Sequence, residues 1–306
     1  AFNEKLSAKL GLSAEDEDRK RVYQTKDVTR NEWSEKYRIA PEVTFYPDEE
    51  ASATVSGYHY VWQMDEVESR EDSSGFTPTV GDMVYNNVEA RYTRQFKDLF
   101  QLTAGGEYLQ EVLDYNMADE TIDTMSGYIQ AEIDMLKHFT FVLGSRFDDH
   151  SAYGSYFSPK LSVMYEPAGT TKIRGSVGKG FKSPTIRQLY YTDLYQHGSY
   201  WYQSNPDLEA ETSLGYSLGI EQMIGSRLLF DLTLFRNDIE DKILNVDTGE
   251  YEDGLPIVSY ENVSEATTQG VELGVKAILT KDLTGTLTYT YTDTEDKDTG
   301  NELRYV

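Results

Sequence analysis

Large apolar residues alternate with small or charged ones along much of this chain, and the segment 212–224 shows the pattern most clearly. One side of the segment carries Leu214, Tyr216, Leu218 and Ile220, and the other carries Ser213, Ser217, Gly219 and Glu221. A period of two residues places successive side chains on opposite faces of a β-strand. The segment therefore predicts a strand with one apolar face. A water-soluble sandwich would show the same alternation, so a single strand leaves the fold open.

The alternation returns along nearly the whole chain and predicts roughly fourteen antiparallel strands joined as sequential hairpins. Short turns are expected at 47–50, 97–98, 136–138, 167–170, 225–226 and 280–282. Longer acidic or aromatic loops are expected at 14–30, 65–82, 113–121, 150–155, 180–211, 244–255 and 293–300. The segment 256–279 is expected to form one long strand. The two classes of connection alternate strictly.

Strict alternation places all short turns at one rim of the sheet and all long loops at the other. Outer-membrane barrels have this arrangement, with short periplasmic turns and longer extracellular loops. The face opposite the apolar one carries charges such as Lys160, Lys172 and Arg174, which a hydrated lumen would solvate. We therefore predict an all-β protein, an antiparallel up-and-down transmembrane β-barrel. In the alternative, a soluble sandwich, the charged face would be the outer one.

Composition agrees with this prediction. The 306 residues include 28 Lys plus Arg and 53 Asp plus Glu, a net charge of -25, which argues against a nucleic-acid partner because phosphate binding needs basic surface. The absence of Cys excludes disulfides and thiolate metal sites. The 24 Tyr residues suit both strands and the interfacial girdles of outer-membrane barrels. The chain starts at Ala1 without a signal peptide and stops soon after a new apolar alternation begins at Leu303, so we interpret it as an interior piece of a longer protein.

Four parts of the chain carry recognisable motifs. They are LGSRFD at 143–148 with FSPKL at 157–161, GKGFKSP at 178–184, NPDLEAE at 205–211, and FRNDIEDKI at 235–243 with YEN at 260–262 and GVEL at 270–273. In order and spacing they resemble the TonB-dependent outer-membrane receptors, ligand-gated transporters for iron chelates, haem, cobalamin and some glycans. The resemblance covers about residues 125–306, whereas residues 1–120 fit only as barrel strands. Ala210 stands where the family usually has Pro.

The resemblance implies a barrel of about 22 strands, of which this chain would supply about fourteen. Residues 1–306 would then be a partial barrel domain, with the plug domain and the final strands absent. The resemblance further implies the outer membrane of a Gram-negative bacterium and active, TonB-coupled uptake of a scarce nutrient. A ferric siderophore is the first candidate, and haem and cobalamin are the others. The implied partners are the TonB energy-coupling complex through the missing plug, the small-molecule chelate, and outer-membrane lipid with lipopolysaccharide.

The resemblance also gives a structural role to a set of motif residues and implies no cofactor. The set comprises Gly180, Phe181, Pro184, Asn205, Pro206, Asp207, Glu211, Asn262, Gly270 and Glu272.

The loop 188–204 is unusually aromatic and supplies the candidate ligand-binding residues. These are Tyr190, Tyr191, Tyr195, His197, Tyr200, Trp201 and Tyr202. Clustered aromatics on an exposed loop favour flat, partly apolar ligands. An interfacial girdle combined with packing of the loop on itself explains the same composition equally well, and the sequence leaves both readings open.

Two other functions fit the same strands. A passive channel of porin type predicts a charged constriction loop folded inward. A soluble or surface-attached adhesive β-protein predicts that the faces of Leu214, Leu218, Leu232 and Leu273 are buried against a second sheet. We expect no enzyme, because no Ser/His/Asp order or paired-carboxylate signal stands out. The carboxylates of 293–302 could hold Ca²⁺ through oxygen ligands or simply be solvated.

Overall fold

The computed structural model describes residues 5–23, 28–69, 80–115, 118–197, 199–263 and 265–303. Within these ranges the chain forms seventeen strands and one short helix. Thirteen strands build one antiparallel sheet and four build a second, smaller one. No helix in the described ranges is long and apolar enough to cross a membrane.

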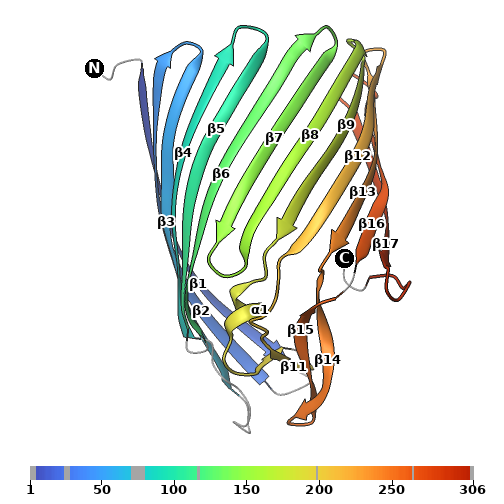
Figure 1. Ribbon diagram of the computed structural model, residues 1–306. Helices are drawn as coiled ribbons and strands as arrows, with labels where there is room; N and C mark the ends of the chain where they lie inside the picture. Colours follow the sequence, from blue (N-terminus) through green and yellow to red (C-terminus); the bar gives the residue numbers. More distant parts are fainter. Residues whose placement is uncertain are drawn as a thin grey trace.

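The large sheet runs strictly up and down, each strand pairing with its neighbours in chain order. Its strands are β1 (Leu6–Tyr23), β2 (Val28–Asp48), β3 (Ala51–Ser69), β4 (Val80–Phe96), β5 (Phe100–Tyr115), β6 (Ala118–Leu136), β7 (Phe139–His150), β8 (Gly154–Ala168), β9 (Thr171–Lys182), β12 (Glu211–Ile224), β13 (Leu228–Glu240), β16 (Ala266–Ile278) and β17 (Thr284–Asp296). They curve into an open barrel wall whose two edges are β1 and β17 (Figure 1). The predicted antiparallel up-and-down architecture is confirmed.

The six predicted short turns all occur, and they lie together at the upper rim in Figure 1. Five connections are shorter than predicted, because strands extend into the ranges 14–30, 65–82, 113–121, 150–155 and 293–300. Charged residues pair across the extended strand ends; for example, Lys36 Nζ of β2 lies 3.3 Å from Glu15 Oε1 of β1. Beyond the membrane both faces of a strand meet water, so the backbone pairing continues after the alternation has ended. Strict alternation of connection length is also wrong, since β5 and β6 are separated only by 116–117 and β7 and β8 only by 151–153.

Three further predictions are wrong, all of them at the opposite rim, which carries the longer connections and which we call the loop rim. Residues 244–255, expected as a loop, belong to a hairpin of β14 (Ile243–Glu252) and β15 (Leu255–Asn262). Its two turn residues, Asp253 and Gly254, both have positive φ, which matches the two-residue turns that follow the twist of a hairpin. The single strand expected over 256–279 is therefore two strands, β15 and β16. The predicted irregular stretch 180–211 contains α1 (Ile186–Tyr190), β10 (Tyr195–His197) and β11 (Tyr200–Gln203).

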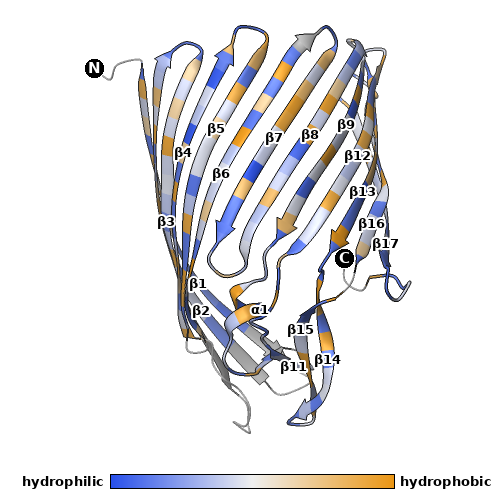
Figure 2. Ribbon diagram, in the orientation of Figure 1, coloured by the Kyte–Doolittle hydropathy of each residue, from blue (hydrophilic) through white to orange (hydrophobic). Residues whose placement is uncertain are grey.

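Figure 2 shows apolar positions alternating with polar ones along the strands. Exposed apolar residues of neighbouring strands share one face, the outer face of the wall. Leu218 lies opposite Leu234, and Leu234 lies opposite Val271. Leu214 is 39% exposed and Leu218 is 56% exposed, while Leu232 and Leu273 are half-buried within their own sheet. The described residues place no second sheet over this face. The adhesive-protein prediction is therefore wrong, and the single apolar layer suits contact with lipid.

The opposite face is polar and lines the concave side of the wall. Hydroxyl pairs cross it, such as Thr44 with Thr54 at 3.0 Å and Ser176 with Ser217 at 2.7 Å. Arg146 bridges Glu107 at 2.8 Å and Asp148 at 2.7 Å. These polar groups can stay hydrated, because the lumen of a wide barrel can hold water.

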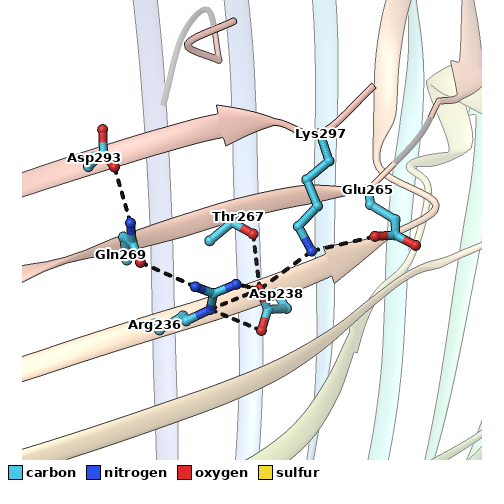
Figure 3. A network of polar contacts seen from close by, with 7 residues as sticks. All are labelled: Arg236, Asp238, Glu265, Thr267, Gln269, Asp293 and Lys297. Atoms are coloured by element: carbon cyan, nitrogen blue, oxygen red, sulfur yellow. Dashed lines mark hydrogen bonds and ion pairs between the residues drawn. The ribbon is translucent and has the colours of Figure 1, made fainter. Parts of the chain in front are cut away.

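Near the loop rim the outer face changes from apolar to polar. Figure 3 shows one network there, in which Asp238 accepts from Arg236 at 2.7 Å and from Thr267 at 2.9 Å, and Gln269 donates to Asp293 at 3.2 Å. Arg236 and Asp238 are two and four residues from Leu234 along one strand, so they share its outward face. We call the outward polar residues of this network, Arg236, Asp238, Thr267, Gln269 and Asp293, the outer polar belt.

Candidate functional site

Two long connections meet at the loop rim and form one unit. The first, between β9 and β12, contains α1, β10 and β11, and the second, between β13 and β16, contains β14 and β15. β11 pairs in parallel with β15, so that Trp201 lies opposite Ile257 and Tyr202 opposite Val258. A parallel pair needs a long crossover between its strands, and the β12–β13 hairpin supplies it. We call α1, β10, β11, β14 and β15 the loop module; it lies below the wall in Figure 1.

The first connection turns into the loop module through a short capped helix. Pro184 precedes Thr185, whose hydroxyl accepts from the Gln188 amide at 3.3 Å, while the Gln188 side chain accepts from the Thr185 amide at 2.8 Å. This is a capping box, and Thr-x-x-Gln is its signature in a sequence. The signal was present in the chain and was missed.

Three polar side chains of the family-like motifs fasten the two connections together. Asn205 donates to the Tyr260 carbonyl at 2.8 Å. Asn262 accepts from the Glu209 amide at 2.8 Å and donates to the carbonyls of Glu209 and Asp241 at 2.9 and 2.8 Å. These bonds satisfy backbone groups of Glu209, Asp241 and Tyr260.

Glu211 is the third of these side chains and is only 7% exposed. Its Oε1 accepts from Lys182 Nζ at 2.9 Å and from the Ile243 amide at 3.2 Å. The carboxylate therefore joins the end of β9, the start of β12 and the start of β14.

The remaining motif residues are spread over the wall and the first connection. The side chain of Asn205 accepts from the Asp207 amide at 3.0 Å, which closes a turn around Pro206. Phe181, next to Gly180 at the end of β9, stacks on Tyr156 with ring centroids 4.6 Å apart. Gly270 is closely packed, because a Cβ there would lie 2.1 Å from the Tyr291 carbonyl oxygen. Glu272 is exposed on the polar face of β16.

Four tyrosines form the centre of the loop module. Tyr195 stacks on Tyr202 at 5.2 Å and meets Tyr191 edge-on at 5.4 Å, and Tyr202 lies 5.9 Å from Tyr260. The hydroxyls of Tyr195 and Tyr260 hydrogen-bond to each other. We call Tyr191, Tyr195, Tyr202 and Tyr260 the tyrosine cluster.

Arg187 of α1 supplies the positive charge of the cluster. Its guanidinium lies 5.5 Å from the ring centre of Tyr191 and 5.4 Å from that of Tyr195. Both distances are within cation–π range. Neither Arg187 nor Tyr260 was among the predicted binding residues, although Tyr260 belongs to the YEN motif.

The loop module bridges the mouth of the wall. On one side Tyr191 packs with Leu113, Tyr115 and Ala118 of β5 and β6. Leu113 shares its face with Glu107, six residues away on the same strand, so this contact is on the concave side. On the other side Leu189 packs with Leu208, Ile243 and Tyr260 of the two connections, and Ala152 and Tyr153, between β7 and β8, pack against this cluster. The module therefore contacts the wall at β5–β6 and at the β7–β8 turn.

Burial raises the pKa of three phenols in this region. Burial raises the pKa of Tyr195, and its hydrogen bond with Tyr260 raises that pKa further. Burial also raises the pKa of Tyr260, and it raises the pKa of Tyr153 to about 12. The region therefore offers hydroxyl groups, ring faces and the Arg187 cation to a ligand, and no phenolate near neutral pH.

The seven predicted binding residues are unequally accessible. Trp201 is 7% exposed, its indole N–H has no hydrogen-bond partner among the described residues, and Tyr191 is buried as well. Tyr190, Tyr195 and Tyr202 are half-buried. Tyr200 is 46% exposed, and the side chain of His197 lies outside the described part of the structure. Packing of the loop on itself thus accounts for the buried rings, and ligand contact stays a prediction.

In the described ranges no group of three or more His, Asp or Glu side chains is placed to hold a metal ion. Around the predicted Ca²⁺ candidates, Asp296 accepts from the amides of Asp298 and Thr299 at 3.0 Å each. This carboxylate closes a turn.

Comparisons with known proteins give a consistent picture. The model of the family described as "TonB dependent receptor-like, beta-barrel" matches residues 4–306. The iron-regulated outer membrane virulence protein of Vibrio cholerae is 31% identical over 179 residues, which cover 56% of this chain and 28% of that protein. The probable TonB-dependent siderophore receptor PirA of Acinetobacter baumannii is 31% identical over 256 residues, covering 75% of this chain and 33% of that protein. The chain thus spans about a third of the length of these relatives.

A similar wall is found among solved structures. A mutant of the ferric enterobactin receptor PfeA from Pseudomonas aeruginosa superposes with a TM-score of 0.78 at 19% identity, covering 98% of this chain and 51% of that one. At this identity the likeness concerns the fold.

Proposed function

The chain belongs to the family of TonB-dependent receptor-like β-barrels, and from this premise we propose that the whole protein is an outer-membrane receptor for active uptake of a scarce nutrient. We propose a ferric siderophore as the ligand, in line with the printed names of the PirA and PfeA proteins. We further propose that the plug domain, the final strands and the contact with the TonB complex belong to the rest of the protein. Lipopolysaccharide and outer-membrane lipid would surround the apolar face.

The observation that supports ligand binding most strongly is that the β9–β12 and β13–β16 connections pair through β11 and β15 into one module at the loop rim. A ligand that touches the loop module meets ring faces, phenol hydroxyls and one guanidinium, which suits an anionic chelate with flat groups. We propose that it contacts the partly exposed Tyr190, Tyr195 and Tyr202 and the exposed Tyr200. Trp201 and Tyr191 would instead hold the module together, because they are buried.

A passive channel is the weaker alternative. It requires a charged constriction loop, whereas the connection that reaches the concave side presents mainly aromatic residues together with Arg187. None of the relatives compared above is a porin by name.

An uptake assay tests the proposal. The complete gene is expressed in a Gram-negative host that lacks its own siderophore receptors, and cells are given radiolabelled iron as a catecholate or a hydroxamate siderophore, or labelled cobalamin. We expect uptake of one chelate, and no uptake in a host that also lacks TonB. Equal uptake without TonB would refute active transport and support the channel.

Two matched variants test whether the loop module contacts the chelate. Tyr200→Ala should weaken chelate binding to intact cells, because it removes an exposed ring of the module. Tyr251→Ala removes another exposed tyrosine, in β14 beyond the cluster, and should leave binding unchanged. Equal loss in both variants would contradict the proposed contact.

A further inference from the structure

An open groove of about 520 Å³ crosses the outer face of the wall from β5 to β12. Ala131, Leu143 and Leu161 lie in one row across β6, β7 and β8, and Ile129, Ser145 and Pro159 lie in the next. All six line the groove. The small side chains of Ala131 and Ser145 leave the hollow, and larger apolar residues form its sides.

The groove faces away from the lumen. Leu143 and Ser145 alternate along β7 with Arg146, whose ion pairs lie on the concave side, so their side chains project outward. Leu143 is itself exposed. In a protein whose outer face contacts lipid, this is a hollow in the membrane-facing surface.

Lys179 lies at the loop-rim end of the groove and lines it. It lies three residues before the end of β9, close to the loop rim, and its cross-strand partner Leu214 is opposite Asp238 of the outer polar belt. A lysine at this level can lay its methylenes on apolar surface and keep its ammonium at the membrane boundary.

The charge of Lys179 is left unmatched by the described residues. The two other lysines of β9 form ion pairs, Lys172 with Glu221 at 3.6 Å and Lys182 with Glu211 at 2.9 Å. In the described ranges Lys179 has no carboxylate partner. An outward ammonium without a counter-ion, above an apolar groove, complements an anionic headgroup above an acyl chain.

We propose that this groove binds one phosphorylated acyl lipid of the surrounding outer leaflet. An acyl chain lies along Ala131, Leu143 and Leu161, and a phosphate oxygen accepts a hydrogen bond from Lys179 Nζ. The inference rests on the outer-membrane location of the barrel and is independent of the chelate proposed above, so lipid binding and uptake can fail separately.

The test measures lipid retention on the whole protein purified in detergent. The protein is incubated with diphosphoryl lipid A or with fully dephosphorylated lipid A, and bound lipid is counted by native mass spectrometry. We expect one retained diphosphorylated molecule. Lys179→Gln should lower its affinity about fivefold, the effect of one basic residue near an anionic lipid headgroup. Ser145→Phe, which fills the groove, should lower retention as well.

Lys172→Gln is the matched control, because it removes a lysine of the same strand from the lumen side. It should retain lipid as the unmodified protein does, and thermal unfolding should show that all three variants are folded. Equal retention of the two lipids would overturn the proposal, as would undiminished retention in Lys179→Gln or in Ser145→Phe. An equal loss in Lys172→Gln would overturn it too, since binding would then follow overall charge.

Discussion

Asn262 offers the sharpest test of how the loop module is held together. Its side chain makes three hydrogen bonds to backbone groups of Glu209 and Asp241. Glu209 belongs to the first connection and Asp241 to the second, so the amide spans both. Substitution Asn262→Ala removes all three bonds. The remaining links between the two connections are the parallel β11–β15 pair, the side-chain bonds of Asn205 and Glu211, and the Tyr195–Tyr260 hydrogen bond.

The magnitude follows from the number and setting of these bonds. A net contribution of about 1 kcal/mol for each would give about 3 kcal/mol in a dry site. The three bonds are exposed, and water can replace part of each, so we expect a loss of about 2 kcal/mol. A loss of that size raises the population of the opened module roughly 30-fold.

Hydrogen exchange measures this opening directly. Amides of β11, β15 and 205–210 should exchange faster in Asn262→Ala by that factor, while amides in the middle of β12 and β13 should not change. Asn245→Ala is the control, because Asn245 lies exposed in the same hairpin and its side chain makes no hydrogen bond to the described residues. Unchanged exchange in Asn262→Ala, or equal acceleration in both variants, would refute the role given to Asn262.

Three further predictions test packing and ionisation. Trp201→Phe should cost much less than Trp201→Ala, because it keeps a buried ring and removes an indole N–H that has no acceptor among the described residues. Trp201→Ala should cost about 3 kcal/mol, and limited proteolysis of the module would compare the two. Gly270→Ala should destabilise the β16–β17 pair by about 1–3 kcal/mol, since its Cβ would clash with the Tyr291 carbonyl, whereas Gly144→Ala, with 3.8 Å to its nearest neighbours, should be mild in thermal unfolding. Burial raises the pKa of Tyr153 to about 12, above the ordinary value of about 10. The neutral phenol therefore stabilises the fold fully below pH ~10, and this contribution is lost as the pH rises toward ~12. Alkaline unfolding of Tyr153→Phe should lack that loss, and an unaltered profile would contradict the assignment.

The sequence predicted the wall well, because its face pattern is local. Leu214 and Leu218 face outward in the structure, as their two-residue spacing predicts, because successive side chains of a strand point to opposite faces of the sheet. The ends of the strands were predicted poorly, since β1 continues through residues where both faces are charged. The helix at 186–190 could have been found from Thr185 and Gln188, the two residues of its capping box.

The loop module could not have been predicted in the same way. Pairing of Trp201 with Ile257 joins two separate hairpins, and no local pattern in either segment encodes it. Burial of Trp201 and exposure of Tyr200 follow from that pairing. The aromatic composition of 188–204 therefore fitted ligand contact and self-packing equally well, and the membrane-facing position of Lys179 carried no signal until strand register placed it beside Leu214.

Glu211 links both connections of the loop module to the wall. Its carboxylate accepts hydrogen bonds from Lys182 at the end of β9 and from the Ile243 amide at the start of β14, so a displacement of either connection would act on the same carboxylate. The parallel β11–β15 ladder joins the two connections, so a ligand that displaced one of them would also displace the other. A movement of the module would therefore reach the junction of β9, β12 and β14 through Glu211 and the concave faces of β5 and β6 through Tyr191. A ligand bound at the loop module would therefore act on the wall at these two places.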